Sequence, residues 1–490
     1  MGPPRRRTVR PDARVALALF SGLLFLAHAA AGQSTPQSGS SPDVPAHGDE
    51  TGTNSPYRPI RYLEDDSRHA DGPRDDPWDP IKYVSLWPGA YLSFGGQHRL
   101  RYESVNSIDL GIDDGRTTSS VLLSRNLLHA DLHLSRGLRV FAQIGGFYAL
   151  GVPRSEAEPP DANDLDVTQV FVESSAELGG IRITGRVGRQ EMALGSTRWV
   201  GTRDGTNVRQ AFDLVRVTLS KHGGWNVETF FGVVPGLRRG VFDDAPDGQD
   251  RFWGMYATLP VLPKKLLGLD VFYLGRRRPD AAYADVRGRE VRHTFGARIF
   301  GETDFGLEYV GHALVQRGSI EDDSVFAWGF AGALWQRLPG ALEPVRLGIR
   351  GDALSGDDRL RDGRTTTFQP LFPNQSFFSA LPAVYPTNLY DAHPLLRIEG
   401  AKMSFEAGCT LFWRQAIEDA VYAPPGTVLV PGEATRARFT AAQTSLSIGY
   451  KADRHFSFNA EYTHVFPGPA ITEGGGTDVD FFGTWTTYTY

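Results

Sequence analysis

The chain has little cysteine, little lysine and no long apolar run beyond its N-terminus. The single cysteine, Cys409, among 490 residues excludes an intramolecular disulfide framework and a zinc site built from cysteines, and we interpret it as a small apolar strand residue. No segment after residue 31 offers the ~18 consecutive apolar residues of a transmembrane helix. With 22% charged residues, the composition excludes a helical membrane protein, and a net charge of -6 gives no indication of nucleic-acid binding.

The N-terminus has the pattern of a secretory signal peptide, which we assign to residues 1–31. Five arginines precede an apolar run over residues 15–27, and Ala29, Ala30 and Ala31 offer small residues for cleavage. Residues 32–79 are rich in Ser, Pro, Gly and Asp and contain few large apolar residues, so they predict a flexible periplasmic leader. The folded domain is expected over residues 80–490.

The rest of the chain alternates apolar and polar residues over short segments. Near the C-terminus, one parity holds Phe456, Phe458, Ala460 and Tyr462, and the other holds Ser457, Asn459, Glu461 and Thr463. Because a strand turns successive side chains to opposite faces, this period of two predicts strands with one apolar and one polar face. Eighteen such strands are predicted, over residues 89–103, 120–134, 137–150, 165–178, 180–193, 209–221, 225–234, 251–260, 266–276, 289–301, 304–316, 324–337, 344–355, 394–404, 407–416, 438–451, 455–466 and 478–490.

Short and long connections alternate between these predicted strands. Connections of a few residues, such as 135–137 and 451–454, follow every second strand, whereas most of the others are long, such as 356–393 and 417–437. This alternation is typical of outer-membrane barrels, which have short periplasmic turns and long external loops. Roughly 400 residues also exceed one ordinary soluble all-β domain. The predicted fold class is therefore an all-β transmembrane antiparallel barrel of about 18 strands, with both termini in the periplasm.

A barrel of this size encloses an aqueous lumen, and the polar strand parity that faces it is rich in charge. In the segment 345–352, Val345, Leu347 and Ile349 face outward, so the charged residues of the other parity face the lumen. Read in this way, twelve arginines and nine carboxylates line the lumen: Arg99, Arg101, Arg125, Arg139, Arg182, Arg186, Arg216, Arg298, Arg346, Arg350, Arg397 and Arg414, with Glu103, Asp131, Glu173, Glu228, Asp270, Glu308, Asp352, Glu399 and Glu461.

Arginine supplies nearly all the positive charge of the chain. The 51 basic residues include six lysines, which leaves 45 arginines. Codon bias in a GC-rich genome explains most of this ratio. The location of the arginines adds a functional interpretation, because guanidinium groups form planar forks that suit carboxylates and lose water more readily than ammonium groups. A lumen lined by them would favour polyanions. The alternative is that they form mutual salt bridges that stiffen the barrel.

Several short motifs accompany the strand pattern. They are Tyr91-Leu92-Ser93-Phe94-Gly95-Gly96 leading to Arg99 and Arg101, then Gly188-Arg189-Gln190-Glu191 followed by Gly195, Arg198, Arg203, Asn207, Arg209 and Phe212-Asp213, and finally Leu371-Phe372-Pro373 and Trp413-Arg414. With these motifs, the stretch from about residue 78 to the C-terminus resembles the alginate export proteins, a family of eighteen-stranded outer-membrane channels.

The resemblance implies a passive channel that exports an anionic, uronate-type polysaccharide such as alginate through an arginine-rich constriction. It makes Arg189 the best single candidate for that constriction, provided that a local bulge turns the side chain inward, because Val187 shares its strand face. The implied partners are the polysaccharide, the lipid bilayer with its lipopolysaccharide, and periplasmic export or scaffold proteins. We expect no enzymatic activity, cofactor, metal or nucleic acid.

Other functions are compatible with a charged barrel. An anion-preferring general porin for small solutes is the nearest alternative, and a purely structural barrel would not need this charge density. A barrel enzyme would need a nucleophile beside a histidine, and none of the histidines lies in such a motif. His129 and His133 share a strand face with Asp131, which could hold a metal ion, although pairing with nearby lumen charges is the simpler interpretation.

Overall fold

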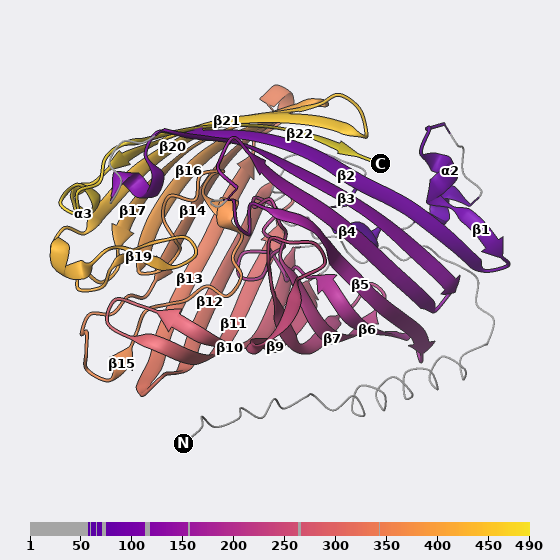
Figure 1. Cartoon of the computed structure of the whole chain (residues 1–490), viewed down its shortest axis with the longest axis horizontal. Helices are drawn as coiled ribbons and strands as arrows, with labels where there is room; N and C mark the ends of the chain where they lie inside the picture. The colour runs from indigo at the N-terminus through magenta and orange to yellow at the C-terminus, as the bar shows by residue number, and fades with distance from the viewer. Residues whose placement is uncertain are drawn as a thin grey trace, which may run out of the picture.

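The structure, a computed structural model, describes residues 57–58, 60–64, 66–70, 75–112, 118–154, 157–262, 266–342 and 344–490. The predicted signal peptide and most of the predicted leader lie outside these residues. In the described part, the alternation of apolar and polar residues continues along long strands, which form one closed antiparallel barrel (Figure 1). No helix in that part of the chain is both long and apolar enough to span a membrane.

Eighteen strands form the wall of the barrel, as the sequence predicted. The largest differences lie at strand ends: β9 begins six residues, β10 ends six residues, and β16 begins and ends five residues from the predicted bounds. The wall strands are β2 (Ala90–Val105), β3 (Ser119–Ser135), β4 (Leu138–Leu150), β5 (Asn163–Leu178), β6 (Ile181–Glu191), β7 (Ala211–Lys221), β8 (Asn226–Gly236), β9 (Ala245–Leu262), β10 (Leu267–Ala282), β11 (Arg287–Glu302), β12 (Leu307–Ile320), β13 (Asp323–Arg337), β14 (Val345–Leu354), β16 (Leu389–Glu399), β17 (Met403–Arg414), β20 (Phe439–Lys451), β21 (Phe456–Pro467) and β22 (Val479–Thr489).

The first and last wall strands close the barrel. Each wall strand pairs antiparallel with the next along the chain, and β2 pairs with β22 from Gln97 opposite Thr489 to Val105 opposite Phe481. The closed ladder gives every wall strand a hydrogen-bonding partner on both sides. This is the condition under which β-structure can cross a bilayer, because lipid offers no hydrogen bonds to a free edge.

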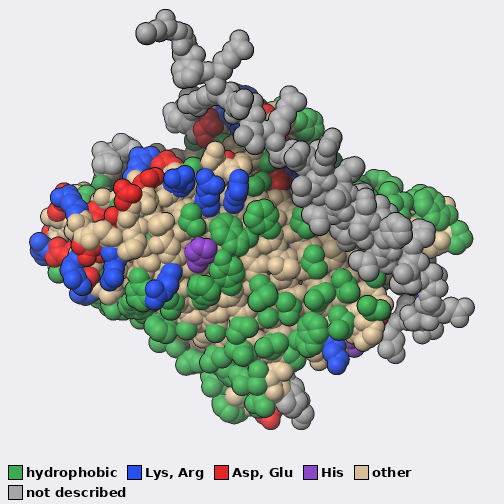
Figure 2. Space-filling model, turned by 90° about the horizontal axis from the view of Figure 1, so that it is seen from below, with side chains coloured by type: hydrophobic (Ala, Val, Ile, Leu, Met, Phe, Trp, Pro, Cys, Tyr) green, Lys and Arg blue, Asp and Glu red, His purple; other side chains and the backbone are tan. Residues whose placement is uncertain are grey.

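Alternate residues along each strand face opposite sides of the wall, as the sequence predicted. On β14, Leu347 and Ile349 are 49% and 51% exposed on the outer face, whereas Arg346 and Asp352 pair with charged groups inside the barrel. Figure 2 shows apolar side chains over the middle of the visible outer face and most of the charged side chains gathered toward one end. The outer face therefore suits a hydrocarbon environment and the inner face an aqueous one.

The two ends of the barrel differ in their connections. We call the "turn end" the end formed by connections 136–137, 179–180, 222–225, 263–266, 303–306, 338–344, 400–402 and 452–455. The "loop end" holds connections 106–118, 151–162, 192–210, 237–244, 283–286, 321–322, 355–388, 415–438 and 468–478. In Figure 1 the loop end lies at the left and the turn end at the right.

Short elements decorate both ends. At the turn end, helix α2 (Asp79–Lys82) precedes β1 (Val84–Trp87), which forms a hairpin with the start of β2. Within the loops, β15 (Arg364–Thr365) pairs with β13, β18 (Val421–Ala423) pairs with β19 (Thr427–Val430), and α3 (Pro469–Thr472) precedes β22.

Two predicted long loops are instead strands. The predicted loop over 277–288 shrinks to residues 283–286, and the predicted loop over 317–323 shrinks to residues 321–322. Inward-facing ion pairs continue the strand pattern into this region, since Arg278 and Arg292 both contact Glu290. The charged and glycine-containing sequence of these two segments resembles a loop, but the cross-strand pair Arg278–Glu290 and the pair Arg292–Glu290 within β11 satisfy charges within the sheet.

Part of the predicted flexible leader packs against the barrel. Residues 57–58, 60–64 and 66–70 include two short 3₁₀ turns, Arg61–Leu63 and Asp66–His69. Ile60 and Tyr62 are 6% and 2% exposed, in contact with aromatic side chains of β4 and β5. The difference from the prediction arises because the few large apolar side chains of the leader are concentrated in this stretch.

The opposite environments of neighbouring residues can be tested on β20. Ile448 is 44% exposed on the outer face, whereas Ser447 lines an internal cavity. We expect Ile448→Arg to lower the free energy of unfolding by ~2–4 kcal/mol if the residue lies near the bilayer midplane. The matched variant Ser447→Arg should cost far less, as measured by reversible urea unfolding in lipid vesicles. Equal costs at the two positions would contradict the assignment of faces.

Candidate functional site: a partitioned, charged lumen

A loop from the loop end folds across the interior of the barrel. Residues 192–210, which we call the "crossbar", leave β6 and return to β7. On the far wall, Arg198 forms an ion pair with Asp352 of β14. Seven strands separate β6 from β14 in one direction around the barrel and nine in the other, so this contact joins nearly opposite walls. The crossbar thus divides a lumen that would otherwise be wide.

Asp204 fixes the crossbar to a third part of the wall. Its carboxylate lies 2.6 Å from a guanidinium nitrogen of Arg125 on β3 and 3.1 Å from one of Arg209. The backbone carbonyl of Asp204 accepts hydrogen bonds from Arg99, at 2.7 Å, and from Arg125, at 2.8 Å. Burial alone would raise the pKa of Asp204, but the guanidinium groups of Arg125, Arg209 and Arg99 outweigh burial and lower it below the usual carboxyl range.

The loop between β14 and β16, residues 355–388, also enters the lumen and pairs with the crossbar. The backbone N–H of Phe372 donates to the carbonyl of Trp199 at 2.9 Å, and the N–H of Gly201 donates to the carbonyl of Phe372 at 3.0 Å. The Phe372 ring packs edge-on against Phe212 of β7 and Phe252 of β9, with ring centroids 4.9 Å apart in both contacts. The two inserted loops therefore form one packed unit.

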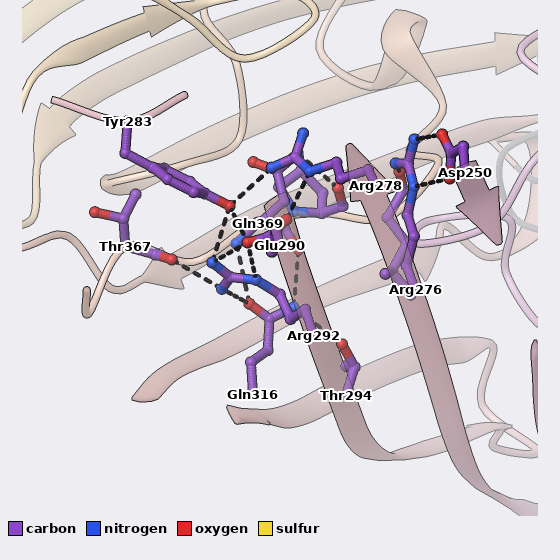
Figure 3. A network of polar contacts seen from close by, with 12 residues as sticks. Asp250, Arg276, Arg278, Tyr283, Glu290, Arg292, Thr294, Gln316, Thr367 and Gln369 are labelled. Atoms are coloured by element: carbon purple, nitrogen blue, oxygen red, sulfur yellow. Dashed lines mark hydrogen bonds and ion pairs between the residues drawn. The ribbon is translucent and has the colours of Figure 1, made fainter. Parts of the chain in front are cut away.

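A network of charged and polar groups ties this second loop to the wall (Figure 3). Arg276 donates to the carbonyl of Leu371 at 3.0 Å and pairs with Asp250 at 2.7 Å. Arg292 donates to the carbonyl of Thr367 at 3.0 Å, which extends the network to the loop. Figure 3 labels the residues involved, which are Asp250, Arg276, Arg278, Tyr283, Glu290, Arg292, Thr294, Gln316, Thr367 and Gln369. These arginines hold structure rather than line an open passage.

Open space remains along the wall from β14 to β2. One cavity, with about 1190 Å³ of atom-free space, is lined by Arg99, Arg101, Arg350 and Arg397 and by the carboxylates Asp204, Glu399, Glu406 and Glu461. A second, of about 690 Å³, shares Arg99, Asp204 and Trp485 with the first and lies toward the turn end. It is lined by six cationic side chains, Arg58, Arg61, Arg99, Arg209, Lys451 and Arg454, and by two carboxylates, Asp204 and Asp453. Charge is balanced in the first cavity and positive in the second.

Many of the predicted lumen arginines pair with wall carboxylates. These ion pairs are Arg101–Glu103, Arg139–Asp131, Arg186–Glu173, Arg216–Glu228, Arg298–Asp270, Arg346–Glu308, Arg346–Glu399 and Arg397–Glu406. Most of them join different strands, so they brace the wall, as the salt-bridge interpretation expects. Arg101 and Arg397 also line the first cavity.

Arg350 differs from these paired arginines. No carboxylate of the described residues lies within ion-pair distance of its guanidinium group, which donates to the carbonyl of Phe377 at 3.1 Å. The same group lies 5.4 Å from the ring of Trp335 and 5.3 Å from the ring of Phe377. Arg350 therefore lines the first cavity without an ion-pair partner among the described residues, although Glu406 lines the same cavity.

The predicted lumen position of Arg189 is wrong. Arg189 lies opposite Val170, which is 45% exposed on the outer face, while the inward positions beside it belong to Gly188 and Phe171. The pairing between β5 and β6 is regular at this point, so no bulge turns the side chain inward. Arg189 instead pairs with Asp213 at 2.7 Å near the loop end.

Two other predicted sites have structural roles. Arg414, 1% exposed, donates to the backbone carbonyls of Ile417, Thr435 and Ala437, so it organises the loop 415–438 rather than a passage. On β3, His133 lies 3.3 Å from Asp131, which in turn pairs with Arg139, as the simpler interpretation expected.

One group of carboxylates outside the lumen is close enough to hold a metal ion. Among the described residues, Asp166, Asp243 and Asp244 bring ligand atoms within 4.8 Å of one another at the loop end. One oxygen of Asp166 already accepts hydrogen bonds from the backbone N–H groups of Asp243 and Asp244. In this structure Asp166 thus holds the loop 237–244 against the start of β5.

The chain resembles known proteins both in sequence and in fold. Residues 90–484 match the family model described as alginate export, and no curated protein gives a significant match. The fold is similar to OpdO from Pseudomonas aeruginosa, at 12% identity over 83% of this chain and 98% of that one, with a TM-score of 0.54. It is also similar to P. aeruginosa OpdK with vanillate (12%, 81% and 98%, TM-score 0.55) and to a BenF-like porin from Pseudomonas fluorescens Pf-5 (11%, 81% and 98%, TM-score 0.56). At such identities the likeness concerns the fold alone.

Substitution of Asp204 tests whether this carboxylate holds the crossbar to the wall. Replacing it by asparagine leaves the guanidinium groups of Arg99, Arg125 and Arg209 without their shared carboxylate, and we expect a loss of about 3–5 kcal/mol in the free energy of unfolding. The outward Asp213→Asn, which breaks one partly exposed pair, should cost ~1 kcal/mol or less. Urea unfolding in lipid vesicles measures both. Equal costs would show that the crossbar is not held by Asp204.

The contribution of Asp204 to the free energy of unfolding should be lost only at low pH. Since its folded pKa lies below the ordinary value of ~3.9, its stabilisation is complete above that value and is lost as the pH falls through the folded pKa. The difference between the wild type and Asp204→Asn should therefore be the same at pH 7 and at about pH 5 and should shrink only in stronger acid. A difference that vanished by about pH 5 would contradict the ionised cluster.

Proposed function

The chain belongs to the alginate export family, and we propose that it carries an anionic, uronate-type polysaccharide out of the cell by passive diffusion through its arginine-lined cavities. An outer-membrane channel is the function that the family and the barrel support directly. The observation that carries the finer proposal is the set of guanidinium groups along the open wall from β14 to β2, above all Arg350.

The distribution of charge suits passage rather than tight binding. Six cationic groups against two carboxylates around the second cavity would attract a polyanion at the turn end, which we assign to the periplasm. Further in, the four arginines and four carboxylates of the first cavity keep any one carboxylate of the polymer from binding too strongly. A transported chain must bind well enough to enter and weakly enough to leave.

The remaining lining suits a sugar backbone. Trp485 lies beside Arg101, whose guanidinium carbon is 5.2 Å from its ring, and Phe377 lies beside Arg350. An aromatic face next to a guanidinium fork can contact a pyranose ring while the fork binds the ring's carboxylate. No step in this transport makes or breaks a covalent bond, so the protein supplies only a path and its electrostatics.

Location and partners follow from the same proposal. The apolar outer face contacts the bilayer and its lipopolysaccharide, and the turn end with α2 and β1 offers the surface that a periplasmic export or scaffold protein would meet. The predicted signal peptide, residues 1–31, would direct export from the cytoplasm.

Arg350 provides the sharpest test of the proposal. In reconstituted single channels, we expect soluble uronate oligomers to block the current and Arg350→Gln to weaken that block roughly tenfold or more, since a hydrogen bond to a charged group contributes about 1.5–3 kcal/mol. Arg350→Lys should have an intermediate effect because it keeps the charge but loses the planar fork. Arg189→Gln, on the outer face, is the matched control and should leave the block unchanged.

The salt dependence of the block separates charge recognition from steric obstruction. Raising the salt concentration from 0.1 M to 1 M shortens the screening length from ~10 Å to ~3 Å, so the uronate block should weaken strongly. A neutral oligosaccharide of equal length should show no such dependence. If the wild-type channel were cation-selective and indifferent to uronates, a general porin would be the better description.

A further inference from the structure

A group of basic side chains lies on the wall near the loop end of β9 to β12. Arg251 of β9 is directly opposite Arg277 of β10. His293 of β11 is directly opposite Arg317 of β12. Arg277 lies opposite Val291, two residues before His293, so the two pairs are diagonal neighbours about 7–8 Å apart. We call Arg251, Arg277, His293 and Arg317 the "outer basic patch".

The outer basic patch faces away from the lumen. Toward the turn end, apolar side chains of the same parity on the four strands are 40–51% exposed on the outer face: Met255, Val271, Phe295 and Val315. The four strands lie in the lower part of Figure 1, and Figure 2 views that side of the barrel from below. In Figure 2 several basic side chains lie where the apolar middle of the visible outer face meets its charged end.

Aromatic side chains mark the boundary between this patch and the apolar band. Nε1 of Trp253 donates to the hydroxyl of Tyr273 at 2.9 Å, and that hydroxyl lies 2.8 Å from Nδ1 of His293. Tryptophan and tyrosine gather where the hydrocarbon of a bilayer meets its headgroups. Arg251 lies two residues beyond Trp253, and Arg277 four beyond Tyr273, toward the loop end. The patch therefore lies at the level of lipid headgroups.

The arginines of the patch have no acidic partner in the described part of the chain. No carboxylate of those residues lies within ion-pair distance of their guanidinium groups. Nε of Arg251 donates to the carbonyl of Gly248 at 3.0 Å, and Arg317 lies 5.0 Å from the centre of the Phe326 ring. Like charges directly opposite one another destabilise a sheet, as at Arg251 and Arg277. A bound anion would remove that repulsion.

Several other exposed charges near the loop end have partners within the protein. These ion pairs are Arg154–Asp164, Arg189–Asp213, Arg287–Asp280 and His464–Asp480. Glu321, which follows β12, accepts a hydrogen bond from the backbone N–H of Arg289. The positive charge of the outer basic patch is thus open to an anion from outside the protein.

We propose that the outer basic patch binds the phosphate groups of a lipopolysaccharide headgroup in the outer leaflet of the membrane. Guanidinium forks bind phosphate oxygens in pairs, and basic side chains at the headgroup level bind anionic lipids. Lipopolysaccharide carries its phosphates on the sugars that bear the acyl chains, which is the depth that Trp253 and Tyr273 mark. This occupant rests on the orientation in the proposed function, with the loop end at the cell surface, but not on the transported polymer.

The first test measures the affinity of the protein, refolded in detergent, for fluorescent lipopolysaccharide without O-antigen. We expect Arg277→Gln to weaken binding roughly tenfold or more, because it removes charged hydrogen bonds to phosphate. Arg189→Gln removes the same charge from another part of the outer face and should leave the affinity unchanged. Heat-modifiable migration on gels checks that each variant has folded. Equal affinities of the wild type and folded Arg277→Gln would overturn the proposal.

Competition identifies the ligand of the patch. Unlabelled lipopolysaccharide should displace the probe, whereas its dephosphorylated form, phosphatidylglycerol and inorganic phosphate should displace it poorly. Equal displacement by phosphatidylglycerol or by inorganic phosphate would show that the patch does not select lipopolysaccharide. The block of channel current by uronates reports on the lumen, so its failure would leave this binding result intact.

A variant at the centre of the patch should change binding and stability in opposite directions. Val291 lies opposite Arg277, so Val291→Glu places a carboxylate within reach of that guanidinium group. Opposite charges facing one another stabilise a sheet. We therefore expect Val291→Glu to unfold at a higher temperature than the wild type in detergent free of lipopolysaccharide, yet to bind lipopolysaccharide more weakly. Val291→Gln, the uncharged control, should show neither change. Undiminished binding by Val291→Glu would contradict recognition by the patch.

Discussion

The requirement that every backbone polar group find a partner within the bilayer governs this protein. The pairing of β2 with β22 meets that requirement for the whole wall and forces alternate side chains to lipid and to lumen. Eighteen strands enclose more space than the side chains of the wall can fill, so inserted segments decide how much of the interior stays open. In this protein the crossbar and the loop 355–388 are two such segments.

The interior segments are held by charge because the lumen face is polar. Wall arginines reach the crossbar through Asp204 and the second loop through backbone carbonyls, so a guanidinium group with five donors can fix a loop and a strand together. Most arginines are used in this way or in cross-strand pairs. Arg350 is the clearest exception, since no carboxylate of the described residues lies within ion-pair distance of it. Counting lumen arginines therefore overstates the net positive charge of the lumen.

The local sequence pattern predicted the strands of the wall but not the loops that fold into the lumen. All eighteen strands, and the inward position of residues such as Arg346 and Arg350, follow from a period of two that each strand carries by itself. The crossbar depends on contacts such as Arg198 with Asp352, which lie 154 positions apart, and no local pattern encodes them. The position of Arg189 follows its strand parity and not its motif, because regular pairing of β5 with β6 keeps it on the outer face with Val187.

The scarcity of lysine has a practical consequence for the sidedness of the molecule. Lys82, Lys221, Lys402 and Lys451 all lie at the turn end, and the loop-end connections contain no lysine. With the turn end in the periplasm, as proposed above, an amine-reactive reagent that cannot cross the outer membrane would find no lysine side chain in the loops at the cell surface. The same reagent applied to opened membranes would reach the opposite face. Because the lysine side chains are confined to one end, amine labelling from each side of the membrane would determine the orientation of the barrel.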